Sequence, residues 1–217
     1  MGVNQWRALD RWPPPAVDSR WHLRAGGGLS PQPPDADEPA DSFRHNPADP
    51  VPTCGGALLL TSDFPAGPFD QSAVESRSDV LVYTSEPLTN PVEVIGRVRA
   101  SIVAASTAPG ADWVVRLCDV DPAGVSRNLV DGVLRVETDA GPASHEIDLW
   151  STAHVFLPGH RIRVQVTSSN FPRWDRNLGG TRGSADPDAG SAGQSVHHDA
   201  VRCSWVSMPV TRTSAGG

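Results

Sequence analysis

The residue types of a catalytic triad are present in this sequence, but the motif that holds a serine nucleophile is not. In α/β-type serine hydrolases the serine lies in a G-x-S-x-G turn between a strand and a helix. The nearest match, Gly124-Val125-Ser126-Arg127-Asn128, has asparagine in place of the last glycine and falls in a predicted hairpin. His145, His154 and His160 lie near serines in sequence, but a triad is defined by geometry. We therefore predict no catalytic residue in this chain.

Metal-binding residue types also occur, in patterns that do not make a site. The segment after Asp119 begins like a calcium-binding loop, but Ala123 and Val130 occupy positions where such a loop needs oxygen ligands. The adjacent pair His197-His198 points to opposite faces of a strand, so we expect one packed and one exposed imidazole. The three cysteines are far apart in the sequence, at Cys54, Cys118 and Cys203. This spacing argues against a zinc site and against a disulfide framework. We predict neither a metal nor a cofactor.

The composition excludes two classes of partner. The 217 residues carry 18 basic side chains, all of them arginine, and 25 acidic ones, giving a net charge of −7. Because this charge repels a phosphate backbone, we predict no nucleic-acid partner. The longest apolar run, Ala57–Leu60, is far shorter than the ~18 residues of a membrane span, so we predict no membrane partner. Residues 1–7 lack the apolar stretch of a secretion signal, and we take the cytoplasm as the expected location.

Apolar residues alternate with polar ones along much of the chain, which is typical of half-buried strands. In residues 161–167, Ile162, Val164 and Val166 share one face, and the opposite face, with its arginines and glutamine, is expected to meet solvent. Trp113 alternates with apolar neighbours and is expected in the core. Strands without long helices between them predict an all-β sandwich. The other predicted strands are residues 79–84, 92–105, 112–120, 129–138, 144–150, 195–203 and 205–210, with a short helix at 70–77.

We expect a single domain, residues 1–217, with two irregular segments. Seven prolines lie between Pro31 and Pro52, and a chain without those amide donors cannot run centrally in a sheet. Residues 26–53 are therefore predicted to wrap around the sandwich. Residues 179–193 are rich in glycine and serine and lack aromatic side chains, so we predict a mobile loop there.

Several segments, taken in order, resemble a known family. They are Asn4–Arg7 with Trp12–Pro14, Asn46–Thr53 with Gly55-Gly56, Asp70-Gln71, Arg77–Tyr83, Asp131–Arg135, Gly159–Arg163, and Ser168–Arg173 with Asn177. The ordered set resembles the C-terminal domain of the X-Pro dipeptidyl-peptidase and cocaine-esterase-like (CocE/NonD) serine hydrolases. The resemblance runs from about Asn4 to Val210.

This resemblance implies a jelly-roll β-sandwich of the galactose-binding-domain-like type. It also implies that the catalytic serine, aspartate and histidine belong to an α/β-hydrolase domain lying upstream, so that none is carried over to a residue here. We predict a non-catalytic module, inactive alone, that packs on an α/β-hydrolase domain and helps to shape its substrate cleft. That domain would lie in the same chain, or in a second chain if the gene is split. A fragment, a split gene and a free-standing domain all fit the sequence.

A packing surface for the hydrolase domain is predicted from aromatic and arginine side chains in irregular segments. Aromatic residues and arginine are concentrated at protein interfaces, and Phe171, Arg173 and Trp174 follow the strand at residues 161–167. Together with Trp6 they are our predicted interface residues. The alternative for Phe171 is that it caps the sandwich core. The alternative for the whole chain is a free-standing carbohydrate- or peptide-binding module, because the sequence contains seven tryptophans and exposed tryptophan rings can stack on sugars.

Overall fold

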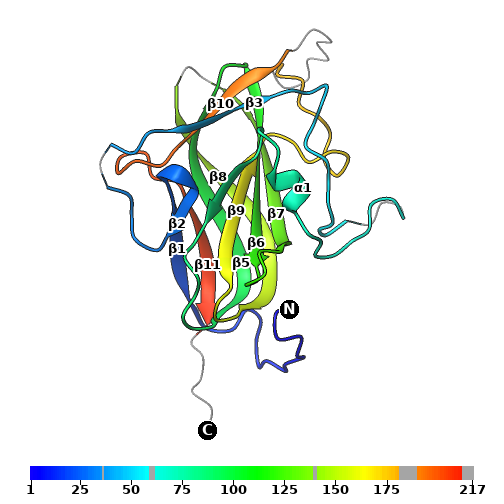
Figure 1. Ribbon diagram of the computed structural model, residues 1–217, viewed down its shortest axis with the longest axis vertical. Coiled ribbons are helices and arrows are strands. Elements are labelled where there is room, and N and C mark those ends of the chain that lie inside the picture. Colours follow the sequence, from blue (N-terminus) through cyan, green and yellow to red (C-terminus); the bar gives the residue numbers. More distant parts are fainter. Residues whose placement is uncertain (36, 59–61, 139–140, 181–189, 212–217) are drawn as a thin grey trace.

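The computed structural model describes residues 1–35, 37–58, 62–138, 141–180 and 190–211. Eleven strands form within these residues, with one turn of 3-10 helix and one short α-helix (Figure 1). No helix in the described ranges is long and apolar enough to cross a membrane. The elements are β1 (Ala16–Arg24), η1 (Ala25–Gly27), β2 (Gly28–Ser30), β3 (Asp41–His45), α1 (Ser72–Glu75), β4 (Leu81–Thr84), β5 (Val92–Ser106), β6 (Gly110–Val120), β7 (Ser126–Glu137), β8 (Ala143–Phe156), β9 (Arg161–Thr167), β10 (Ala192–His197) and β11 (Trp205–Thr211).

The strands make one continuous sheet that folds over into two facing layers. Long strand β5 pairs with β8 along one side, and with β10 and β11 end to end along the other. On its other side β10 pairs with β3. β11 pairs with β1, and β1 in turn pairs with β2. The second layer has the order β4-β9-β6-β7, and it joins the first through a single parallel pair between β2 and β4. The predicted all-β, jelly-roll-like sandwich is confirmed.

The alternating apolar residues meet between the two layers. On β6, Trp113, Val115 and Leu117 have no exposed surface, and Ile162, Val164 and Val166 of β9 are equally buried. They pack on apolar residues of β5, β8 and β11 in one cluster. The core position predicted for Trp113 is confirmed.

The outer face of β9 differs from the prediction. Gln165 is buried rather than exposed to solvent, and so is Arg116 on neighbouring β6. The reason is that the segment between β3 and β4, which carries α1, lies against this face (Figure 1). Polar alternation therefore marks a second buried layer here, one held by hydrogen bonds instead of apolar contacts.

The proline-rich segment, predicted to wrap around the sandwich, also contributes strands to the sheet. Residues 26–53 include the two short strands β2 and β3, and among the described strands β3 pairs with β10 alone, at the end of the strand order. An edge position agrees with the lack of amide donors in this region. Of the predicted loop at residues 179–193, positions 181–189 lie outside the described residues, and the last two residues already belong to β10. β10 ends at His197, earlier than predicted.

Strand β8 is longer than predicted because it continues through an irregularity at Trp150. This residue has φ of 70°, a conformation uncommon for a bulky side chain. The pairing register between β5 and β8 shifts between Arg97 and Arg99. The Trp150 amide donates to Asp148 Oδ1 at 3.0 Å, and the indole is left exposed.

Candidate functional site

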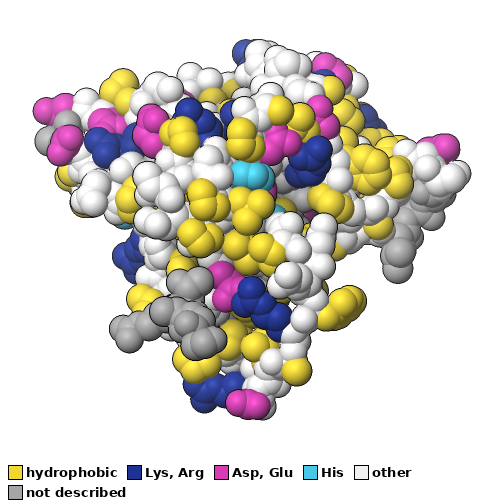
Figure 2. Space-filling model, turned by 60° about the horizontal axis from the view of Figure 1, so that its bottom comes forward, with side chains coloured by type: hydrophobic (Ala, Val, Ile, Leu, Met, Phe, Trp, Pro, Cys, Tyr) yellow, Lys and Arg dark blue, Asp and Glu magenta, His cyan; other side chains and the backbone are white. Residues whose placement is uncertain are grey.

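The first fifteen residues form an exposed arm at one end of the sandwich. The Trp6 side chain is fully exposed (102%), and Trp12 and Leu9 are exposed as well. Between this N-terminal arm and the adjoining ends of β5 and β8 lies a hollow of about 920 Å³. Figure 2 brings this end forward and shows hydrophobic side chains gathered across the middle of the face. We call this site the N-terminal hollow; its lining includes Val3, Trp6, Leu9, Trp12, Glu93, Ile95, His154 and Val155.

Glu93 anchors the arm to the sandwich. Its residue is only 8% exposed, and its carboxylate accepts hydrogen bonds from Arg7 of the arm and from Thr211 at the end of β11. Further along the arm, Pro13 lies against Gly96 of β5. Gly96 has φ of 135°, and a Cβ there would lie 3.0 Å from Pro209 Cγ and 3.4 Å from Pro13 Cβ. The start of the arm is also bound to β8, because the Met1 amino group donates to Ala153 O at 2.6 Å and the Val155 amide donates to Met1 O at 3.3 Å.

The structure brings three of the four predicted interface residues together and places Trp6 elsewhere. His154 near the end of β8 and His160 just before β9 both contact Asp119, each at 2.9 Å. The start of β9 therefore lies at the end of the sandwich that carries the hollow. Residues 171–174 follow the other end of β9, so Trp6 lies at the opposite end from them.

At this second end, aromatic rings are covered by arginines of the same segment. The Arg173 guanidinium lies 4.5 Å from the centroid of the Trp174 ring, and that of Arg176 lies 5.5 Å from the Phe171 ring. Phe171 is still 39% exposed, so it does not simply cap the core. Trp174 is half-buried.

Beneath these loops lies a buried ionic layer, the Asp131 network, that sequence reasoning missed. The Asp131 carboxylate accepts hydrogen bonds from Arg173 and, at 3.2 Å, from Asn170. It lies 3.7 Å from Nε of Arg116, whose side chain is 2% exposed. Arg116 also donates to the amide oxygens of Gln71 at 3.1 Å and Gln165 at 2.7 Å. The network fastens the α1 segment and the 170–173 loop to β6, β7 and β9.

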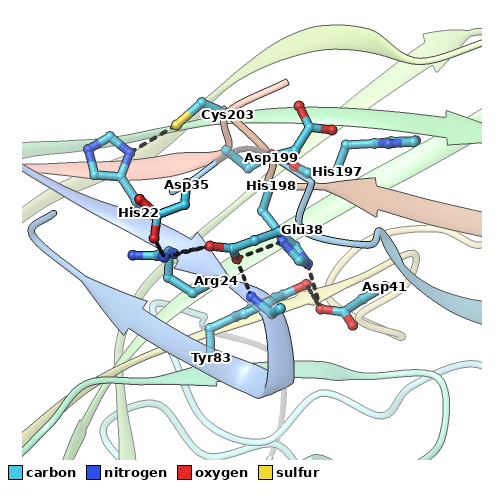
Figure 3. Close-up of polar contacts among 12 residues, drawn as sticks. His22, Arg24, Asp35, Glu38, Asp41, Tyr83, His197, His198, Asp199 and Cys203 are labelled. Atoms are coloured by element: carbon cyan, nitrogen blue, oxygen red, sulfur yellow. Dashed lines mark hydrogen bonds and ion pairs between the residues drawn. The ribbon is translucent and has the colours of Figure 1, made fainter. Parts of the chain in front are cut away.

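A second buried cluster, the His198 cluster, ties the proline-rich segment to both layers (Figure 3). The His198 imidazole has no exposed surface; its Nε2 lies 3.0 Å from Asp41 Oδ2 and its Nδ1 lies 3.5 Å from Glu38 Oε2. Tyr83 donates to the same Asp41 oxygen at 2.9 Å, and Arg24 donates to Glu38 at 2.6 Å. The adjacent His197 is half-buried, so the two histidines do differ in burial.

The electrostatics of the His198 cluster favour ionised carboxylates. Burial acts to raise the pKa of Asp41, but hydrogen bonds from His198 and Tyr83 outweigh it, and the pKa is lowered overall. Burial is likewise outweighed at Glu38, whose pKa is lowered by the Ala25 amide and by Arg24. The pKa of Tyr83 is raised by burial and by Asp41, so the phenol stays protonated and donates. This arrangement suits a structural fastening.

Two pairs resemble parts of a nucleophilic site without its geometry. Cys203 Sγ lies 3.0 Å from His22 Nδ1, but burial raises the pKa of the thiol and lowers that of the imidazole. Both groups are therefore favoured in their neutral forms, and a reactive thiolate is disfavoured. Ser195 Oγ lies 3.5 Å from His197 Nε2, while the nearby Asp199 carboxylate is bound by Arg202. In the described part of the chain, no three His, Cys, Asp or Glu residues are grouped to hold a metal ion.

Comparison with known proteins places the chain in a family. Residues 1–206 match the X-Pro dipeptidyl-peptidase C-terminal non-catalytic domain. The chain belongs to this family. Membership of the X-Pro dipeptidyl-peptidase C-terminal domains agrees with the jelly-roll-like sandwich and with the resemblance that the sequence segments carry.

Relatives of this C-terminal domain are much longer proteins. The chain is 41% identical to the cocaine esterase of Rhodococcus sp. (strain MB1 Bresler) in an alignment of 197 residues that covers 82% of this chain and 34% of that esterase. Two solved structures each share 29% identity and a TM-score of 0.88: an aminopeptidase from the marine sediment archaeon Thaumarchaeota archaeon, and an α-amino acid ester hydrolase. They match 98% and 97% of this chain, and 39% and 40% of their own lengths. The chain thus spans little more than a third of its relatives, in which the domain is fused to a catalytic α/β-hydrolase domain.

Proposed function

We propose that this C-terminal domain is a non-catalytic module that packs on an α/β-hydrolase domain and helps to shape the substrate cleft of a serine hydrolase acting on ester or X-Pro peptide bonds. The observation that carries the proposal is the match of residues 1–206 to a non-catalytic domain. It is supported by the structure, whose titratable clusters serve as fastenings between segments. The hydrolase domain is the partner, in the same chain or as a separate chain.

A free-standing carbohydrate- or peptide-binding module is the second candidate, since Trp6 and Trp12 are exposed beside a hollow. Sugar sites combine such rings with several polar groups that hydrogen-bond hydroxyls. Here Asn4, Gln5 and Asp10 line the hollow together with Val3, Leu9 and Ile95, so the site offers polar as well as apolar groups. The match to a non-catalytic domain of peptidases favours a protein surface as the occupant.

The isolated chain should not hydrolyse p-nitrophenyl acetate or an X-Pro p-nitroanilide above the rate given by an equal concentration of an unrelated protein. The reason is that no activated serine is held in a nucleophile elbow. A serine-directed fluorophosphonate should leave the chain unlabelled, as read by intact mass. Turnover that the fluorophosphonate abolishes, together with one added label, would overturn the non-catalytic assignment.

A further inference from the structure

We infer that the outer face of the first layer, formed by β1, β11, β5 and β8, binds an acidic polysaccharide whose sugar rings carry both carboxylates and free hydroxyls. β1 and β11 run side by side in Figure 1. The inference goes beyond the proposed function, because the α1 segment and its contacts lie on the other layer. We call this surface the arginine face, and its central side chains are Arg20, Trp205, Ser207, Arg99 and Glu146.

Strand pairing places two arginines on this face with a serine between them. Arg20 of β1 lies opposite Ser207 of β11, and Ser207 lies opposite Arg99 of β5. Paired residues project from the same side of a sheet. Here it is the outer side, because the alternate residues Val206 and Met208 of β11 are buried in the core. Two strand spacings put the arginines about 10 Å apart at their Cα atoms, so both long side chains can bind one carboxylate above the serine hydroxyl.

Both guanidinium groups are free to donate. The Arg20 guanidinium lies 4.3 Å from the centroid of the Trp205 ring, and this stacking holds it in place while its N–H edges stay open. In the described part of the chain, neither Arg20 nor Arg99 makes an ion pair or a side-chain hydrogen bond. The acid opposite Arg99 is Asp148, but Arg97 already binds both of its oxygens. A planar carboxylate suits a free guanidinium, because the two groups form parallel hydrogen bonds.

Exposed carboxylates on the same face indicate that the ligand also carries hydroxyl groups. Glu146 of β8 lies opposite Ser101 of β5, in the row next to the two arginines. Glu146 is exposed, and so is Asp18 of β1; neither side chain has a hydrogen bond or ion pair among the described residues. These carboxylates repel a second carboxylate but accept hydrogen bonds from hydroxyls. A run of acidic peptide side chains lacks such donors, so the face favours an acidic sugar.

A firmly held aromatic ring stands at the edge of the arginine face. Trp150 of β8 has φ of 70°, a left-handed conformation that is strained for a bulky side chain and that is concentrated at functional sites. Asp148 holds this conformation by accepting from the Trp150 amide at 3.0 Å, and Arg97 fixes the Asp148 carboxylate. The indole is 66% exposed. It offers a flat apolar surface of the kind on which sugar rings stack.

The test is affinity electrophoresis of the full chain in native gels that contain polygalacturonate. The chain carries a net charge of −7, so this polymer repels the molecule as a whole and retardation reports a local site. The wild type should be retarded by polygalacturonate and should migrate unchanged in dextran, which is neutral. Arg20→Ala/Arg99→Ala should raise the dissociation constant at least tenfold, because it removes two charge-assisted contacts. The matched control, Arg11→Ala/Arg44→Ala, removes the same charge from two exposed arginines outside the face and should bind within twofold of the wild type.

Trp150→Gly is a second variant, in which loss of binding cannot be attributed to a damaged fold. Glycine adopts φ of 70° without strain, so the melting temperature should not fall below that of the wild type. Binding to polygalacturonate should weaken at least threefold, because the stacking ring is gone.

The inference is wrong if the wild type is not retarded by polygalacturonate, if the two double variants bind alike, or if Trp150→Gly binds as the wild type does. Equal or stronger retardation by dextran sulfate or by poly-L-glutamate would show attraction to charge alone and would overturn the choice of an acidic sugar. Each of these outcomes leaves docking on a hydrolase domain unaffected, so the failure of this inference is distinct from the failure of the proposed function.

Discussion

Replacing Asp131 with asparagine should lower the free energy of unfolding by about 3–5 kcal/mol, the effect expected when one partner of a buried ion pair is removed. Asp131 is 4% exposed and faces Arg116, which is 2% exposed, and Arg173, which is 12% exposed. The remaining partners of Arg116 are the amide oxygens of Gln71 and Gln165. The substitution keeps the side-chain shape but leaves two guanidinium groups without their carboxylate.

Urea denaturation of the wild type and the variant measures this difference. Asp148→Asn is the matched control, because Asp148 pairs with Arg97 on the surface, where side-chain exposures are 39% and 55%. Surface ion pairs contribute little, and an asparagine can still accept from the Trp150 amide, so the control should unfold almost as the wild type does. Equal effects of the two substitutions would show that the Asp131 network does not hold the α1 segment as described.

Replacing His198 with alanine should lower the free energy of unfolding by about 2–4 kcal/mol, chiefly from the cavity that it leaves and in smaller part from partly buried carboxylates that lose a donor. His198 is fully buried, while its carboxylate neighbours Asp41 and Glu38 are 33% and 13% exposed. His197→Ala is the control on the next residue. Because His197 is only half-buried, its substitution should stay within about 1 kcal/mol of the wild type.

The cost of losing His198 should depend on pH in a defined direction. The pKa values of Asp41 and Glu38 are lowered from 3.8 and 4.5, so these carboxylates stabilise the fold fully above about pH 5. That contribution is lost as the pH falls through the lowered values in the folded state. The gap between wild type and His198→Ala should therefore narrow from pH 5 to pH 3, leaving the cavity part. A gap that widens with acid would contradict the assigned hydrogen bonds.

The sequence was sufficient for the fold because its strongest signal is the apolar period of two. Strand β9 begins and ends where the alternation does, at Arg161 and Thr167, and Trp113 lies in the core. The alternation does not predict what covers the polar face of β9. Arg163 and Gln165 alternate as solvent-facing residues do, and only tertiary packing shows that the α1 segment covers them. A polar residue gives the same alternating pattern in the sequence whether its hydrogen-bond partner is water or a buried side chain.

The sequence indicated which types of residue are exposed in the irregular segments, but not which of these residues lie close together. Aromatic and arginine residues of irregular segments indicated Trp6 and the 171–174 loop, yet sequence gives no distance between segments far apart in the chain. The strand pairing puts them at opposite ends of the sandwich. The His198 cluster could not be predicted for the same reason, since it joins residues from four segments that are far apart in the sequence: Arg24, Glu38 with Asp41, Tyr83 and His198.

The most direct test of the central claim is ester hydrolysis by the hydrolase portion of the Rhodococcus cocaine esterase, measured with and without this chain. If the chain docks on such a domain and helps to shape its cleft, the hydrolase portion alone should turn over p-nitrophenyl acetate poorly, and the chain alone should not turn it over at all. Adding the wild-type chain should raise the rate with saturable dependence on its concentration. A rate that stays the same at every concentration of folded chain, or turnover by the chain alone, would contradict the account.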